Sequence, residues 1–87
     1  MRRHQVEVDA PRGEVVAVLR EDEFADVDAS QEGRGLIDLV DGTGYITELG
    51  GRGTRLRIID EGDGSTVTRL VERLRNRGLG VTHQVLD

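Results

Sequence analysis

Hydrophobic and polar positions follow two periods along this chain, and each change of period marks a new element. Residues 3–8 alternate with a period of two, which predicts a half-buried strand. Residues 11–23 predict a helix, because Pro11 suits a first helical turn and Asp9 is an expected N-cap. The apolar stripe of this helix consists of Val15, Val16, Val18 and Leu19.

The middle of the chain predicts strands joined by glycine-containing turns. Residues 25–35 are polar and indicate a loop or a ragged strand. Residues 36–40 and 45–49 predict a hairpin, since the intervening Asp41-Gly42 pair favours a type I′ turn. A second glycine-rich turn is expected over residues 50–53.

The last third of the chain predicts a strand, a helix and a closing strand. Residues 54–60 alternate, and residues 81–86 end the pattern. Between them, residues 66–77 predict a helix with Ser65 or Asp63 as N-cap and Gly78 as the C′ glycine. Apolar side chains recur in this helix with the spacing i, i+3, i+4 and i+7, at Val67, Leu70, Val71 and Leu74.

Together these elements predict one α+β domain over residues 1–87. The order β-α-β-β-(β)-α-β favours a two-layer, ferredoxin-like sandwich, with two helices on one face of an antiparallel sheet of four or five strands. The run His4-Gln5-Val6 is echoed by His83-Gln84-Val85. If the terminal strands are neighbours, His4 and His83 could lie close together, and both are interpreted as structural or surface residues rather than metal ligands.

Composition narrows the classes of function. The chain has 17 acidic residues and 12 basic ones, all of them arginine, for a net charge of -5. This balance argues against non-specific binding to DNA or anionic membranes. The absence of lysine indicates a high-GC or halophilic source, and stability is then expected to rise with salt. With no cysteine and no long apolar run, a cytoplasmic protein without a cofactor is expected.

Arginine supplies the main candidate site. Arg69, Arg73 and Arg77 recur at i, i+4 and i+8 of the second predicted helix, and Arg55 and Arg57 lie on the preceding strand. Such a set indicates a surface for nucleic acid, phosphate or an acidic partner. The alternative interpretation is a solvated helix face. No histidine, serine or carboxylate motif indicates catalysis, so an enzyme is not predicted.

Parts of the chain resemble three known families. Residues 51–87 resemble the N-terminal sensory region of haloarchaeal transcription regulators of the bacterio-opsin activator type, which implies a regulatory module. The element order resembles ACT-type amino-acid-binding domains, which implies ligand binding at the loop before the first helix, here at Arg12 and Gly13. The opening run, residues 6–11, is similar to the start of START-like lipid-binding domains, which need a longer chain.

The expected function is therefore a non-enzymatic regulatory or protein-interaction module, acting as a homodimer and linked to transcription regulation. An ACT-like sensor of small ligands is one alternative. A nucleic-acid-binding protein that uses the arginine face of the second helix is the other. No membrane partner and no metal site are predicted.

Overall fold

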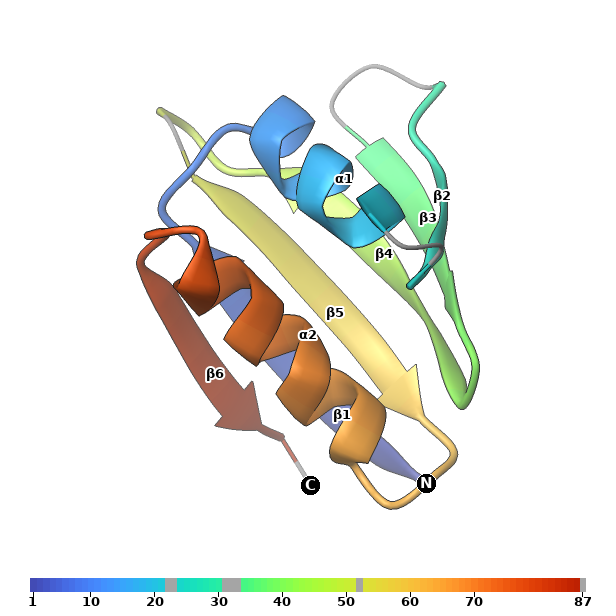
Figure 1. Cartoon of the computed structure of the whole chain (residues 1–87). Coiled ribbons are helices and arrows are strands. Elements are labelled where there is room, and N and C mark those ends of the chain that lie inside the picture. Colours follow the sequence, from blue (N-terminus) through green and yellow to red (C-terminus); the bar gives the residue numbers. More distant parts are fainter. Residues whose placement is uncertain (22–23, 31–33, 52, 87) are drawn as a thin grey trace.

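Two helices lie on one side of a six-stranded antiparallel sheet in the computed structural model of the chain (Figure 1). The structure describes residues 1–21, 24–30, 34–51 and 53–86. The elements follow in the order β1 (Arg2–Val8), α1 (Arg12–Arg20), β2 (Asp26–Asp28), β3 (Arg34–Leu39), β4 (Gly42–Glu48), β5 (Thr54–Asp60), α2 (Ser65–Asn76) and β6 (Val81–Val85). The predicted α+β class and its two-layer arrangement are confirmed.

The strand order is β2-β3-β4-β5-β1-β6, which is not the predicted ferredoxin-like order of four or five strands. The difference arises after α1, where β2 and β3 extend the sheet beyond β4. β2 occupies part of the polar segment for which a loop or ragged strand was the expectation. It is only three residues long and pairs with β3 alone. Three residues are too few for an alternating pattern to predict a strand.

The core fills the space between the sheet and the helices. Alternate residues of each central strand point toward the helices, as Val6, Leu56 and Ile58 show. The apolar stripe of α2 covers them, and Leu70 and Leu74 are fully buried. Because the core is almost entirely aliphatic, its stability depends on close packing of Val, Leu and Ile rather than on aromatic area.

Both helices begin differently from the sequence prediction. Asp9 is not the cap of α1: Pro11 occupies the N-cap position, and the backbone N–H of Asp9 donates instead to the carbonyl of Gly80. α1 ends at Arg20, and the predicted end at residue 23 lies outside the described residues.

At α2 the N-cap is Gly64 in the left-handed region (φ 88°), so neither predicted cap residue takes that place. The predicted C′ role of Gly78 is confirmed by its φ of 80°.

The hairpin between β3 and β4 turns one residue earlier than predicted. Val40 and Asp41 form the turn, and Gly42 already belongs to β4. The φ of Gly42 is not positive, so the turn does not require a glycine there. The glycine is needed instead for the distance between β4 and β5. A Cβ at Gly42 would collide with the Ile59 carbonyl oxygen, and one at Gly44 would come within 2.5 Å of that of Arg57. These glycines let β4 approach β5 closely.

Candidate functional site

No element in the described part of the chain covers the sheet face opposite the helices, so this face is a candidate surface (Figure 1). Strand residues that alternate with the core positions point outward there. Leu36 and Tyr45 are paired neighbours on β3 and β4, and they are 54% and 60% exposed. An aromatic and a leucine side chain side by side on an open sheet favour contact with another molecule.

Strand register arranges this face in three rows that cross the sheet. The first row runs from β3 to β6 through Leu36, Tyr45, Arg57, Gln5 and Gln84. The second follows Arg34, Thr47, Arg55, Glu7 and Thr82. The third follows Asp38, Thr43, Ile59 and Arg3.

Charges on the uncovered face balance although the chain as a whole is acidic. Four arginines and four carboxylates occupy outward strand positions in the described residues, namely Arg3, Arg34, Arg55, Arg57, Glu7, Asp26, Asp28 and Asp38. Arg55 donates to Glu7 at 2.9 Å between Nη2 and Oε1 within the sheet. The surplus of negative charge therefore lies on the rest of the molecule. Two copies of the uncovered face repel each other less than two copies of the acidic remaining surface do.

The five arginines that the sequence grouped together are divided between the two layers. Arg55 and Arg57 point from β5 to the uncovered face, because core residues alternate with them. Arg69, Arg73 and Arg77 belong to the helix layer on the other side of the sheet. A single anion-binding surface made from all five is therefore not formed.

Arginines of the helix layer hold neighbouring segments together. The guanidinium carbon of Arg73 lies 4.5 Å from the centroid of the Phe24 ring, and that of Arg69 lies 5.6 Å from it. Both contacts have cation–π geometry. Arg77 forms an ion pair with Glu21, next to the end of α1. These contacts favour a structural role for Arg69, Arg73 and Arg77. No sequence signal connected Phe24 with these arginines.

The ligand loop suggested by the ACT resemblance is engaged in internal contacts. Arg12 donates to the backbone carbonyl oxygens of Ala29 and Arg34, and its Nε lies 3.6 Å from a carboxylate oxygen of Glu48. Gly13 is exposed beside a cavity of about 360 Å³, and a Cβ there would meet open space. Gly13 is thus not required for a close backbone approach within the chain.

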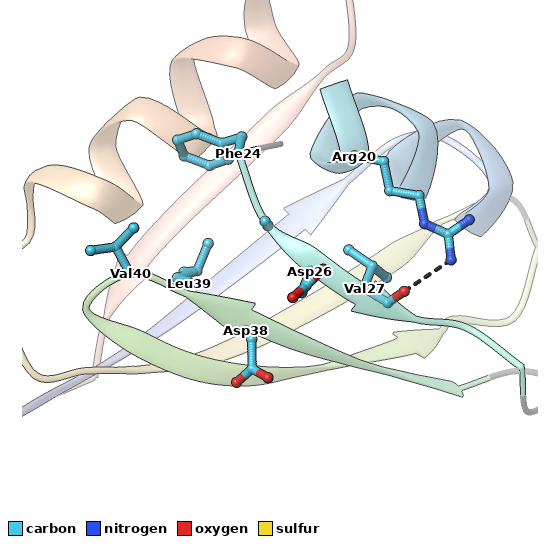
Figure 2. A pocket seen from close by; sticks show the side chains of 8 residues that line it. Arg20, Phe24, Asp26, Val27, Asp38, Leu39 and Val40 are labelled. Carbon is cyan, nitrogen blue, oxygen red and sulfur yellow. Dashed lines mark hydrogen bonds between the residues drawn. The ribbon is translucent and has the colours of Figure 1, made fainter. Parts of the chain in front are cut away.

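A second groove, of about 590 Å³, lies between the end of α1 and strands β2 and β3 (Figure 2). Phe24, Leu39 and Val40 supply its apolar surface. The guanidinium of Arg20 donates to the carbonyl oxygen of Val27 at 2.9 Å, and Asp38 points away from the helices. Among the described residues that line it, this groove brings together no group of reacting side chains.

A line of polar side chains connects β5, β1 and β6, and it is buried at Asp60 and His4 but only half-buried at His83. Nδ1 of His4 lies 2.9 Å from Nε2 of His83, and Nε2 of His4 lies 3.7 Å from Oδ2 of Asp60. His4 and Asp60 are 4% and 1% exposed. In the described residues, neither of those two facing atoms has a hydrogen-bond partner, while Oδ1 of Asp60 accepts from the N–H of Gly62.

The two imidazoles form the pair that the sequence echo allowed. One ring must donate and the other accept across the 2.9 Å contact, so the pair accommodates one extra proton but not two. Burial lowers the pKa of His83, and the neighbouring His4 and Arg75 lower that pKa further. Three or more metal-ligating side chains do not gather anywhere in the described part of the chain.

Comparison with protein-family models, curated proteins and solved structures finds no match to this chain. The regulator-like and ACT-like resemblances therefore stay predictions, as do the halophilic source and the cytoplasmic location. Neither helix in the described ranges has the length and apolar character needed to cross a membrane.

Proposed function

We propose that this protein is a non-enzymatic protein-interaction module, of a regulatory kind, that acts as a homodimer through its uncovered sheet face. The observation that carries the proposal is the exposed Leu36–Tyr45 pair within a face whose charges balance. Antiparallel sheets commonly leave one face to water, and such faces are then mainly polar. Here the face is also mainly polar, but Leu36 and Tyr45 lie side by side within it and are both more than half exposed.

The other two functions receive less support from the geometry. A nucleic-acid surface needs arginines gathered on one side, whereas those of this chain are divided between two layers and several contact neighbouring side chains. An ACT-like ligand site at Arg12 and Gly13 would have to compete with the contacts that Arg12 already makes.

Light scattering tests the proposal directly. The mass in solution is expected to rise from one subunit to two as the concentration passes through the micromolar range. Tyr45 is the sole tyrosine and the chain has no tryptophan, so tyrosine emission reports on this face alone. Quenching of that emission by acrylamide is expected to weaken as the dimer forms. A mass of one subunit at every concentration would contradict the dimer.

A further inference from the structure

We propose that two copies dock face to face about a twofold axis that runs parallel to the strands, between β4 and β5. This inference rests on the proposed function and adds the arrangement of the two copies. It follows from the strand register, because such an axis reverses the strand order while it keeps each row in place. β3 of one copy then lies over β1 of the other, and β4 lies over β5.

This axis makes the uncovered face complementary to itself. In the row of Asp38, β1 contributes Arg3, so Asp38 of each copy lies over Arg3 of the other. In the row of Arg34, β1 contributes Glu7, which gives a second pair of opposite charges. Each pair occurs twice, since the axis relates the two copies.

Beside the axis itself, an aromatic ring meets a cation. Tyr45 on β4 and Arg57 on β5 are direct neighbours in the middle row. The axis between their strands lays Tyr45 of one copy over Arg57 of the other, an arrangement that suits cation–π stacking. No two like charges coincide in the three rows under this operation.

A twofold axis perpendicular to the strands is the main competing arrangement. It places each strand over the same strand of the other copy and exchanges the two outer rows. Arg34 of one copy would then lie over Asp38 of the other, and Arg3 over Glu7. Its outer rows are also complementary. Its middle row, however, places Arg57 over Arg57, and two guanidinium groups facing each other at an interface repel.

The dimensions of the face agree with a reversible dimer. Packed sheets are rotated by about 30° relative to each other, which corresponds to a twofold axis about 15° from the strand direction. At about 7 Å from the axis, where β3 and β1 lie, that rotation separates facing residues by roughly 4 Å, which an arginine side chain can span. Strands of this length and number give a projected area of roughly 500 Å² on each copy, which is at the small end for specific interfaces and agrees with a weak, reversible dimer.

Two complementary charge reversals distinguish the two axes. Asp38→Arg places an arginine over Arg3 in its own dimer, and Arg3→Asp places an aspartate over Asp38. Each variant alone is expected to lose at least about tenfold in dimer affinity. An equal mixture is expected to recover dimers that contain one chain of each kind, because both facing pairs are again opposite in charge. Native mass spectrometry resolves the mixed dimer by mass.

The perpendicular axis gives a different result for the same mixture. There, the arginine introduced by Asp38→Arg faces Arg34 of the other chain, and the aspartate introduced by Arg3→Asp faces Glu7, so mixing does not restore the dimer. Glu72→Arg on the helix layer changes the net charge by the same amount as Asp38→Arg, and it is expected to dimerise as the unmodified chain does. Circular dichroism confirms that each variant is folded.

The remaining outcomes separate this inference from the proposed function. If the unmodified chain dimerises but the single variants dimerise equally well, the face-to-face arrangement is overturned, and of the proposed function only the homodimer stands, without its assignment to the uncovered face. Mixed dimers that do not recover while both single variants are monomeric would favour the perpendicular axis. An unmodified chain that stays monomeric overturns both.

Discussion

The two sides of the sheet use the same residue type in different ways. On the helix side, Arg73 stacks on Phe24 and Arg77 pairs with Glu21, so arginine joins segments that are distant in the sequence. On the uncovered side, Arg55 and Arg57 belong to rows of outward side chains whose charges balance. Arginine content alone therefore does not indicate anion binding. The layer in which each side chain lies decides what it can do.

The largest expected effect sharpens this contrast with two adjacent residues of β5. Leu56 is fully buried under the helices, and Arg57 is exposed on the other face. Leu56→Ala is expected to lower the free energy of unfolding by about 2–5 kcal/mol, because it removes packed methyl groups and leaves a cavity. Arg57→Ala is expected to change that free energy by less than about 0.5 kcal/mol. Urea denaturation of the monomer at low concentration measures both.

Arg57→Ala should nevertheless weaken dimerisation, which light scattering measures. If Arg57→Ala destabilised the monomer as much as Leu56→Ala, the division between a packed and a solvated face would be wrong.

A smaller effect is expected where β4 approaches β5. Gly44→Ala would bring a Cβ within 2.5 Å of the Arg57 carbonyl oxygen, so the two strands must separate. Overcrowding of this kind costs about 1–3 kcal/mol, to be read from thermal unfolding. Gly50→Ala is the matched control, because a Cβ at Gly50 meets open space. Equal stability of the two variants would show that the close approach of β4 and β5 is not required.

The smallest effect concerns the pH dependence of stability. Because the pKa of His83 is lower in the folded chain than in the unfolded chain, the unfolded chain binds more protons between the folded-state pKa and about pH 6.5. The contribution of His83 is therefore fully present above that pH, and it is lost as the pH falls toward the folded-state pKa. His83→Gln is expected to flatten the fall in melting temperature over this range.

The difference between the pH profiles of the unmodified chain and the His83→Gln variant isolates the contribution of His83, since carboxylates titrate at lower pH in both. Protonation of both rings would also remove the hydrogen bond to His4, and Arg75 adds a further positive charge nearby. Identical pH profiles for the two chains would mean that His83 contributes nothing to the linkage.

The sequence predicted those features that depend on local periodicity. The stripe of Val67, Leu70, Val71 and Leu74 located α2 to within one residue, because the helical period alone determines which face is buried. The sequence made the close approach of His4 and His83 conditional on the terminal strands being neighbours. β1 pairs with β6 in the structure, and the two rings are in contact.

Features that depend on distant segments were not predictable in the same way. Gly42 has the local sequence of a hairpin turn, but its role is to admit the backbone of β5, which lies elsewhere in the chain. The division of the arginines between two layers likewise depends on which sheet face α2 covers. Leu36 and Tyr45 become an exposed pair only through the register of β3 with β4, which the predicted turn placed one residue too late.

The position of β1 also has a consequence for how the chain folds. β1 lies between β5 and β6, both of which come from the second half of the sequence. Its contact with β6 joins His4 to His83, which are 79 residues apart. During synthesis β1 must therefore wait for segments that emerge much later, whereas the β3–β4 hairpin can form at once. Long-range pairing of this kind slows folding, and β1 spends that interval with both of its edges unpaired.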